Sequence, residues 1–228
     1  MKKVLFYVMF TGLFTMFTFG QKKETRTVSG FTEIDASSAF EITVSKGSTE
    51  SLIIEADEAI MSKVRSEVRN GVLHLYLDDE RKVKNVKTLK ASVVMKNLDK
   101  VSLSGACKLT ANDQFTPDRF KGNCSGASSL TLNVNTGELS IDASGVSKIQ
   151  MKANVTGDAK LDVSGTSKVQ ADDFVVKTAT IESSGTSKVT VNVAETLNAN
   201  SSGASTIEYK GSPAIQANTG GASKIRKI

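Results

Sequence analysis

The chain has 228 residues and a formal net charge of +5, and only 6% of its residues are aromatic. This weakly basic balance, with a single His and no Trp, indicates neither a nucleic-acid surface nor an aromatic stacking cleft for sugars. Two cysteines are too few for a four-ligand zinc site, and we expect neither a metal nor a cofactor.

Residues 1–20 have the organisation of a secretory signal peptide. Lys2 and Lys3 precede the apolar run 4–19, and Gly20 is a small residue suited to cleavage after it. The run has 16 residues, fewer than the ~20 that a membrane-spanning helix needs. The residue directly after Gly20 is Gln21 and not a cysteine, so no lipid anchor is expected. We therefore expect an exported protein in the periplasm, on the outer-membrane surface or secreted, with no stable membrane insertion after signal removal.

Residues 25–100 form an irregular N-terminal β segment within a single domain over 21–228. Apolar and polar residues alternate over 40–44, as in a half-buried strand. Asn70-Gly71 is the strongest short signal for a β-hairpin. No linker rich in Pro, Gly or Ser separates this segment from residues 101–228, so we expect it to cover the open end of a repeat array.

Residues 101–228 repeat a six-residue phrase built around Ser-Gly seven times. The seven glycines are Gly105, Gly126, Gly145, Gly165, Gly185, Gly203 and Gly221. Their spacings of 21, 19, 20, 20, 18 and 18 residues indicate a repeat architecture in which each unit stacks on the next. Four positions after the glycines lie Leu109, Leu130, Ile149, Val169, Val189, Ile207 and Ile225. This column is aliphatic throughout, so we expect it to point inward.

Period-two alternation on both sides of a Ser-Gly bend predicts strand, bend and strand within each repeat. The repeat is too short for a βαβ unit, which needs roughly 30 residues, and it has no helical pattern. We therefore predict an all-β fold, a single-stranded parallel β-helix with ~20-residue coils and the irregular N-terminal β segment. Residues 112–121, which include Pro117, are expected to form a loop between the first two repeats.

Four stretches carry a resemblance to a known family. They are the opening Val28-Ser29-Gly30-Phe31, the acidic Glu55-Ala56-Asp57-Glu58, the hairpin Asn70-Gly71-Val72-Leu73 and the Ser-Gly-(Ala/Thr)-Ser-Lys repeats. Over roughly residues 30–213 the chain resembles the auto-transporter adhesin head domain, also called the GIN domain. This is a domain of unknown function in secreted Bacteroidetes-type proteins. The resemblance implies a right-handed β-helix at the cell envelope, and it transfers no catalytic residue.

Two columns of charged residues accompany the central repeats and are the candidates for a binding surface. They consist of Lys148, Lys168 and Lys188 after the glycines, and Asp142, Asp162 and Glu182 before them. Alternation places both columns outside. One interpretation is a solvated surface whose opposite charges relieve repulsion, because surface ion pairs are common and weak. The functional interpretation is a row of charges that binds anionic glycans or another anionic cell-surface polymer. A calcium site on the acids is disfavoured, since each coil offers one acid and calcium takes roughly six to eight oxygens.

Reactive side chains are few. The repeated serines are expected to bond the backbone at the bends, because a catalytic serine needs a base and the only histidine, His74, lies outside the repeats. Cys107 and Cys124 lie in neighbouring coils, four positions apart in register. A disulfide between them requires close Cα atoms, so a bridge and two separate buried thiols remain alternatives.

These features favour a non-catalytic exported cell-envelope protein, a rigid β-helical rod with an adhesin-like or surface-interaction role. The first alternative is a polysaccharide lyase or hydrolase, since β-helices host such enzymes, and its candidate residues are Asp142, Asp162, Lys148 and Lys168. The second alternative is a self-assembling envelope scaffold. Open coil ends expose unpaired strand edges, through which copies could form homo-oligomers head to tail.

Overall fold

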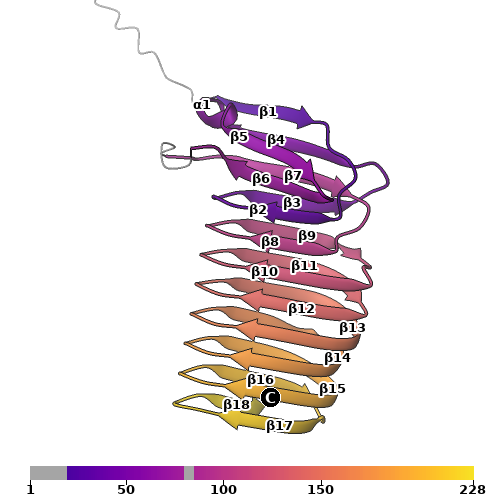
Figure 1. The fold of residues 1–228 in the computed structure, drawn as a ribbon, viewed down its shortest axis with the longest axis vertical. Coiled ribbons are helices and arrows are strands. Elements are labelled where there is room, and N and C mark those ends of the chain that lie inside the picture. Colours follow the sequence, from indigo (N-terminus) through magenta and orange to yellow (C-terminus); the bar gives the residue numbers. More distant parts are fainter. Residues whose placement is uncertain (1–19, 80–84) are drawn as a thin grey trace, which may run out of the picture.

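The computed structural model describes residues 20–79 and 85–228, so the predicted signal peptide 1–20 lies outside the described residues except for Gly20. This part of the chain is a stack of β-strands with one short helix (Figure 1). The elements are β1 (Gln21–Arg26), β2 (Glu33–Ala36), β3 (Glu41–Lys46), β4 (Ser51–Asp57), α1 (Glu58–Met61), β5 (Val64–Arg69), β6 (Val72–Leu77), β7 (Leu89–Met95), β8 (Lys100–Leu103), β9 (Lys108–Phe115), β10 (Arg119–Cys124), β11 (Ser129–Thr136), β12 (Glu138–Ala143), β13 (Lys148–Val163), β14 (Lys168–Ser183), β15 (Lys188–Ser201), β16 (Thr206–Gly211), β17 (Ala214–Thr219) and β18 (Lys224–Lys227). Across these two ranges, no helix is long and apolar enough to cross a membrane.

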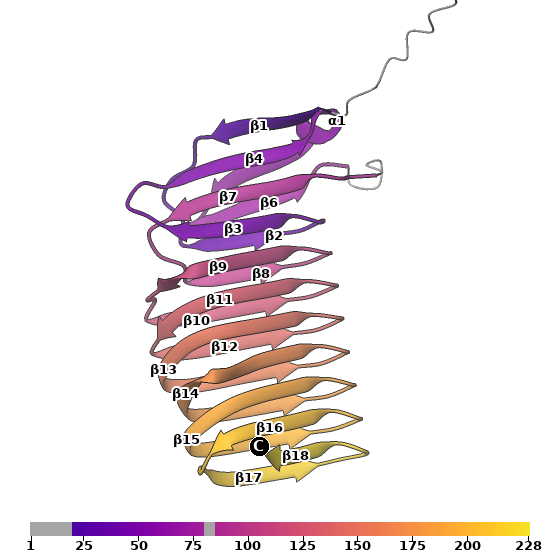
Figure 2. The same cartoon turned by 180° about the vertical axis from the view of Figure 1, so that it is seen from behind.

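The strands of successive coils stack in parallel as a β-solenoid, which confirms the predicted fold class. Each coil runs along one side of the stack, turns, and returns along the other side (Figure 1 and Figure 2). The aliphatic column is in register through Ile149, Val169 and Val189 in β13, β14 and β15. All three side chains are 0% exposed, so each rests on its counterparts in the neighbouring coils. Burying one such side chain contributes roughly 1.5–3 kcal/mol, which each coil gains only by stacking.

Glycine makes the tight corner of each repeat, and these corners form one edge of the stack (Figure 1). Gly165 has a φ of +70°, and a Cβ on it would lie 2.4 Å from the carbonyl oxygen of Gly145. The corners approach so closely because the Thr166 N–H donates a 2.8 Å hydrogen bond to that carbonyl. Both the backbone angle and the close stacking therefore require glycine. At the opposite edge β13, β14 and β15 curve round without a break in the strand.

The N-terminal segment contributes a coil of its own as well as a cap. β2 pairs in parallel with β6 and β8, and β3 pairs in parallel with β7 and β9. The coil formed by β2 and β3 therefore lies directly against the first repeat. Its corner is Ser38, which has a φ of +75° and accepts a hydrogen bond from the N–H of Ala106, as the glycines do in later coils.

Antiparallel strands and the helix close the N-terminal end of the stack. β4 is antiparallel to β7 and β1 to β4 on one side, while β5 is antiparallel to β6 on the other. The predicted hairpin joins β5 and β6, where Asn70 and Gly71 both have positive φ. α1 follows β4 and buries Ile60 and Met61 against the same end.

The prediction of a loop over residues 112–121 is wrong. β9 extends to Phe115 and β10 begins at Arg119, so only three residues separate the two strands. The extra length of this repeat is absorbed by a β-bulge, since Ala111 lies opposite Leu132 whereas Gln114 lies opposite Asn133. A bulge keeps the strand paired while it inserts unpaired residues.

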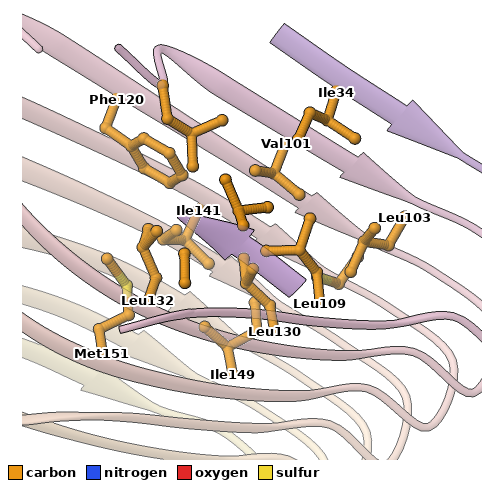
Figure 3. Packing of buried hydrophobic residues seen from close by; sticks show 14 of the residues in the cluster. Ile34, Val101, Leu103, Leu109, Phe120, Leu130, Leu132, Ile141, Ile149 and Met151 are labelled. Carbon is orange, nitrogen blue, oxygen red and sulfur yellow. The ribbon is translucent and has the colours of Figure 1, made fainter. Parts of the chain in front are cut away.

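The core is a continuous file of apolar side chains between the two sides of the stack (Figure 3). Ile34, Val101 and Ile141 belong to one side of this file. Gly122 interrupts it, and a Cβ there would lie 2.8 Å from Cδ1 of Ile141 and 3.3 Å from Cε1 of Phe120. The large neighbours fill the space that this glycine leaves, so the file stays closely packed.

Candidate functional site

The two predicted charge columns lie on opposite faces of the solenoid. Two positions before and after a corner glycine, the side chains point inward and meet, since Ser183 Oγ and Ser187 Oγ are buried and 2.8 Å apart. One step farther from the corner, Glu182 and Lys188 therefore point outward on opposite sides. No ion pair joins the two columns in the part of the chain that the structure describes. Within the acid column, Asp162 instead lies 3.2 Å from the ammonium of Lys160 on its own strand.

We call the side that carries Lys148, Lys168 and Lys188 the lysine face, and the opposite side the acid face. The three lysines are Cα partners in successive parallel strands. Stacked strands are about 4.8 Å apart, so the ammonium groups emerge as a regular ladder along the axis of the stack.

Toward the N-terminus, acids alternate with lysines in this same ladder. Glu55, Lys90 and Glu41 occupy the ladder positions in β4, β7 and β3. The Lys23 ammonium lies 3.1 Å from the Glu55 carboxylate, and the Lys108 ammonium lies 3.4 Å from the Glu41 carboxylate. At this end of the lysine face, neighbouring charges therefore compensate one another.

Lys188 is compensated as well, by an acid that the sequence did not single out. Its ammonium lies 2.8 Å from the carboxylate of Glu208, whose side chain is only 7% exposed. Arg226 from the next coil also donates to Glu208. Hydrogen bonds from Lys188 and then Arg226 lower the pKa of Glu208, so the carboxylate stays charged although it is buried.

Lys148 and Lys168 have no such partner: no carboxylate in residues 20–79 or 85–228 lies within ion-pair distance of either ammonium. Beside them, Gln150 and Gln170 are also Cα partners, and their amides are joined by a 3.4 Å hydrogen bond. We call these four side chains the Lys–Gln patch. It presents two adjacent cations and two amides on one face of two parallel strands.

A groove of about 520 Å³ adjoins the patch toward the broad bend. Gln150 and Gln170 form part of its lining, together with Asn133, Lys152 and Asp172. Asp172 is itself held by a 2.7 Å ion pair with Lys210. Asp173 also lines the groove, so it extends the patch with polar groups of both charges.

The acid face carries Asp142, Asp162 and Glu182 in register, and Asn200 and Asn218 continue the column. Asn200 donates a 2.8 Å hydrogen bond to Glu182, and Asn218 donates a 2.9 Å hydrogen bond to Asn200. A groove of about 530 Å³ runs along these side chains. Within the described ranges, no group of three or more His, Cys, Asp or Glu side chains is placed to hold a metal ion.

The repeated serines bond the backbone at the corners, as Ser147 does by donating to the carbonyl of Ser144 at 2.6 Å. His74 Nδ1 lies 3.1 Å from a carboxylate oxygen of Asp35. Asp35 lies between His74 and Ser102 in the ladder of paired strands. The histidine is therefore not next to the Ser102 hydroxyl. The contact between His74 and Asp35 has no signal in the sequence, because it depends on the coil that turns at Ser38.

Both cysteines are buried, with Cys107 1% and Cys124 2% exposed. Burial raises the pKa of the Cys124 thiol to about 12, with smaller contributions from Asp142 and Cys107. At this pKa the thiol stays protonated at neutral pH and is a poor nucleophile. A disulfide between the two residues stays one of two alternatives, the other being two separate buried thiols.

Comparisons with known proteins agree with this architecture. The family described as "Putative auto-transporter adhesin, head GIN domain" matches residues 30–213. A structure of a putative adhesin from Bacteroides fragilis superposes with a TM-score of 0.86 at 22% identity, covering 92% of this chain and 97% of that one. A putative adhesin from Parabacteroides distasonis superposes with a TM-score of 0.72 at 18% identity, covering 92% of this chain and 97% of that one. A "Putative lipid binding protein" from the same species superposes with a TM-score of 0.70 at 20% identity, covering 91% of this chain and 96% of that one. No curated protein matches the chain significantly. At these identities the solved structures show the fold alone.

Proposed function

Because the chain belongs to the family of putative auto-transporter adhesin head GIN domains, we propose that it is an exported, non-catalytic cell-envelope protein with an adhesin-like role. The Lys–Gln patch of this protein binds the carboxylate or sulfate groups of anionic glycans or of another anionic cell-surface polymer. Export is supported by the pattern of residues 1–20, in which two lysines precede an apolar run of 16 residues.

The observation that carries this proposal is the pair of uncompensated lysines. Two like charges about 5 Å apart in water repel by roughly 0.8 kcal/mol. Elsewhere in the ladder a glutamate removes this repulsion, as Glu41 does for Lys108 and Glu208 for Lys188. Between Lys148 and Lys168 an external anion can take the same place.

The geometry of the patch suits a polymer that lies along the stack. Lysines occupy the ladder in the three successive coils of Lys148, Lys168 and Lys188, so an extended anionic chain parallel to the axis meets one ammonium per coil over this stretch. Gln150 and Gln170 offer amide groups for hydroxyls beside those contacts. Repeated weak contacts along one chain raise the overall affinity without any deep pocket.

A non-catalytic role is supported by the separation of the residues that the lyase alternative needs. Its candidate acids, Asp142 and Asp162, lie on the acid face, whereas Lys148 and Lys168 lie on the lysine face. Side chains on opposite faces of one solenoid cannot act on the same bond. General acid–base catalysis requires both groups within hydrogen-bond reach of the reacting atoms.

The experiment compares binding of polygalacturonate, heparin and neutral dextran to the protein and to the double variant Lys148→Ser/Lys168→Ser. Exposed ion pairs contribute about 0.2–1 kcal/mol each, so the double variant should lose roughly 2- to 30-fold in affinity for the anionic polymers. Binding to the anionic polymers should also weaken with added salt, whereas dextran should not bind.

The matched control is Lys23→Ser/Lys108→Ser, which removes the same charge from the same ladder but at two lysines paired with glutamates. It should leave the affinity almost unchanged. Equal losses in both double variants would show that only net charge matters. Equal binding by the protein and the Lys148→Ser/Lys168→Ser variant would overturn the assignment of the patch.

A further inference from the structure

The two ends of the solenoid are finished differently. At the N-terminal end, antiparallel strands continue both sides of the stack, and α1 packs against them. The outer strands of that end, β1 and β5, are rich in charged residues, with the sequences QKKETR and VRSEVR. Charged edge strands discourage pairing with another chain. These features disfavour at this end the head-to-tail joining that the sequence offered as an alternative.

The C-terminal end carries none of these features in the described residues. The outer edges of β17 and β18 pair with no described strand, since β17 pairs with β15 and β18 with β16. β17 has the uncharged sequence AIQANT and is exposed throughout. Ile215 is 43% exposed, although its partner Leu197 in the preceding coil is 0% exposed. The apolar file thus ends on an open strand edge.

We propose that this end is an interface with a second copy of the chain, and that two solenoids join tail to tail about a two-fold axis. In this arrangement β17 of each copy pairs antiparallel with β18 of the other. The N-terminal end demonstrates that this solenoid accepts antiparallel strands on both sides, as β4 and β5 add to β7 and β6. A symmetric second copy supplies both missing strands at once, and the interface closes on itself as a dimer.

Charge selects this pairing over the other two-fold arrangement. β18 has the sequence KIRK, so pairing β18 with its own copy would bring like cations together. Pairing β17 with β18 instead places Asn218, the last residue of the acid column, opposite the partner's Lys224. Both residues lie three positions from the corner at Gly221, so they are at the same distance from the edge of the stack. Ala217 likewise faces the partner's Ile225, whereas Ile215, six positions from the corner, faces the partner's Lys227.

Sedimentation equilibrium of the protein from about 1 μM to about 1 mM measures this association. The expected result is a monomer–dimer equilibrium, with a mass that reaches and does not exceed twice that of the monomer. Ile215→Lys should raise the dissociation constant at least about tenfold. The matched control is Ile53→Lys, because Ile53 is 41% exposed near the closed end. That variant should dimerise as the unaltered protein does.

A second pair of variants tests the geometry at an exposed position that cannot disturb the core. Asn218→Asp places a carboxylate opposite the partner's Lys224 and should tighten the dimer, whereas Asn218→Lys should weaken it. The same two changes at the exposed Asn154, far from this end, should have no effect. A monomer throughout the range, masses beyond the dimer, equal effects of Ile215→Lys and Ile53→Lys, or no difference between the two Asn218 variants would each overturn the proposal.

Discussion

The Lys188 ammonium lies 2.8 Å from the carboxylate of Glu208, which is almost fully buried between strands of successive coils. Arg226 Nε donates to the same carboxylate from 3.1 Å. These three residues belong to β15, β16 and β18, so a single acid connects the last three coils on the lysine face. In a stack whose coils are stabilised by their neighbours, such a contact controls how readily the end frays.

Replacing this acid by its neutral isostere should destabilise the C-terminal coils. Glu208→Gln leaves Lys188 and Arg226 facing each other without a carboxylate, and the expected loss in unfolding free energy is about 1–3 kcal/mol. Urea unfolding and hydrogen exchange of β16 measure it. The control is Glu182→Gln on the acid face, where an exposed carboxylate accepts from Asn200, and it should cost less than about 0.5 kcal/mol. Comparable losses in the two variants would contradict this role of Glu208.

The same contact predicts a specific pH dependence. Lys188 and then Arg226 lower the pKa of Glu208 below its ordinary value of 4.5, so folding favours the charged carboxylate. The stabilisation is therefore complete above about pH 4.5 and disappears as the pH falls through the lower pKa of the folded state. The difference in unfolding free energy between the protein and Glu208→Gln should be large at pH 7 and much smaller near pH 3. A difference that stays constant over this range would refute the ion-pair explanation.

Two buried hydroxyls at one corner should respond unequally to removal. Ser205 donates to the carbonyl of Ser202 at 2.7 Å, so the 2.8 Å contact between Ser201 and Ser205 has the Ser201 hydroxyl as donor. Ser205→Ala leaves the buried Ser201 hydroxyl without its acceptor and should cost about 1–3 kcal/mol in unfolding free energy. Ser201→Ala leaves Ser205 with its other bond and should cost less than about 1 kcal/mol. Thermal unfolding of both variants checks the order, and the reverse order would contradict the assignment of the donor.

The sequence predicted the inside and outside of this solenoid but not the angle at its corners. Alternation through Ile149, Val169 and Val189 identifies the inward column, because side-chain direction in a strand has a period of two. The corner reverses the chain completely, and no alternation pattern encodes that angle. Lys168 and Asp162 are therefore both outside, as predicted, but on faces that never meet.

Contacts between coils were also beyond prediction from the sequence. In the strand register Glu208 is the Cα partner of Thr190, and Lys188 is the partner of Thr206. Only the side-chain positions show that Glu208 forms an ion pair with Lys188. Likewise, Ser38 turns a coil without a glycine, so the glycine spacing that marks the other corners could not reveal it. Whether a lysine has a carboxylate partner depends on such contacts. The sequence therefore indicated the column of lysines but could not show that Lys148 and Lys168 are its uncompensated pair.

Close stacking of the corners can be separated from backbone strain by two glycines with the same conformation. Gly165 has a φ of +70° and Gly30 a φ of +74°, and alanine is strained at both. A Cβ on Gly30 would meet nothing within 4 Å, whereas one on Gly165 would lie 2.4 Å from the backbone oxygen of Gly145. Gly30→Ala should therefore cost only the left-handed conformation, about 1–2 kcal/mol, and Gly165→Ala clearly more, about 3 kcal/mol or above.

Urea unfolding of the two variants measures this difference, and hydrogen exchange locates it. In Gly165→Ala the amide of Thr166 should lose protection, because its 2.8 Å bond to Gly145 requires the two corners to remain in contact. Gly30→Ala should leave protection in the repeats unchanged. If the two substitutions destabilise the protein equally, the corners can move apart at little cost, and stacking of the repeats depends on the apolar file alone.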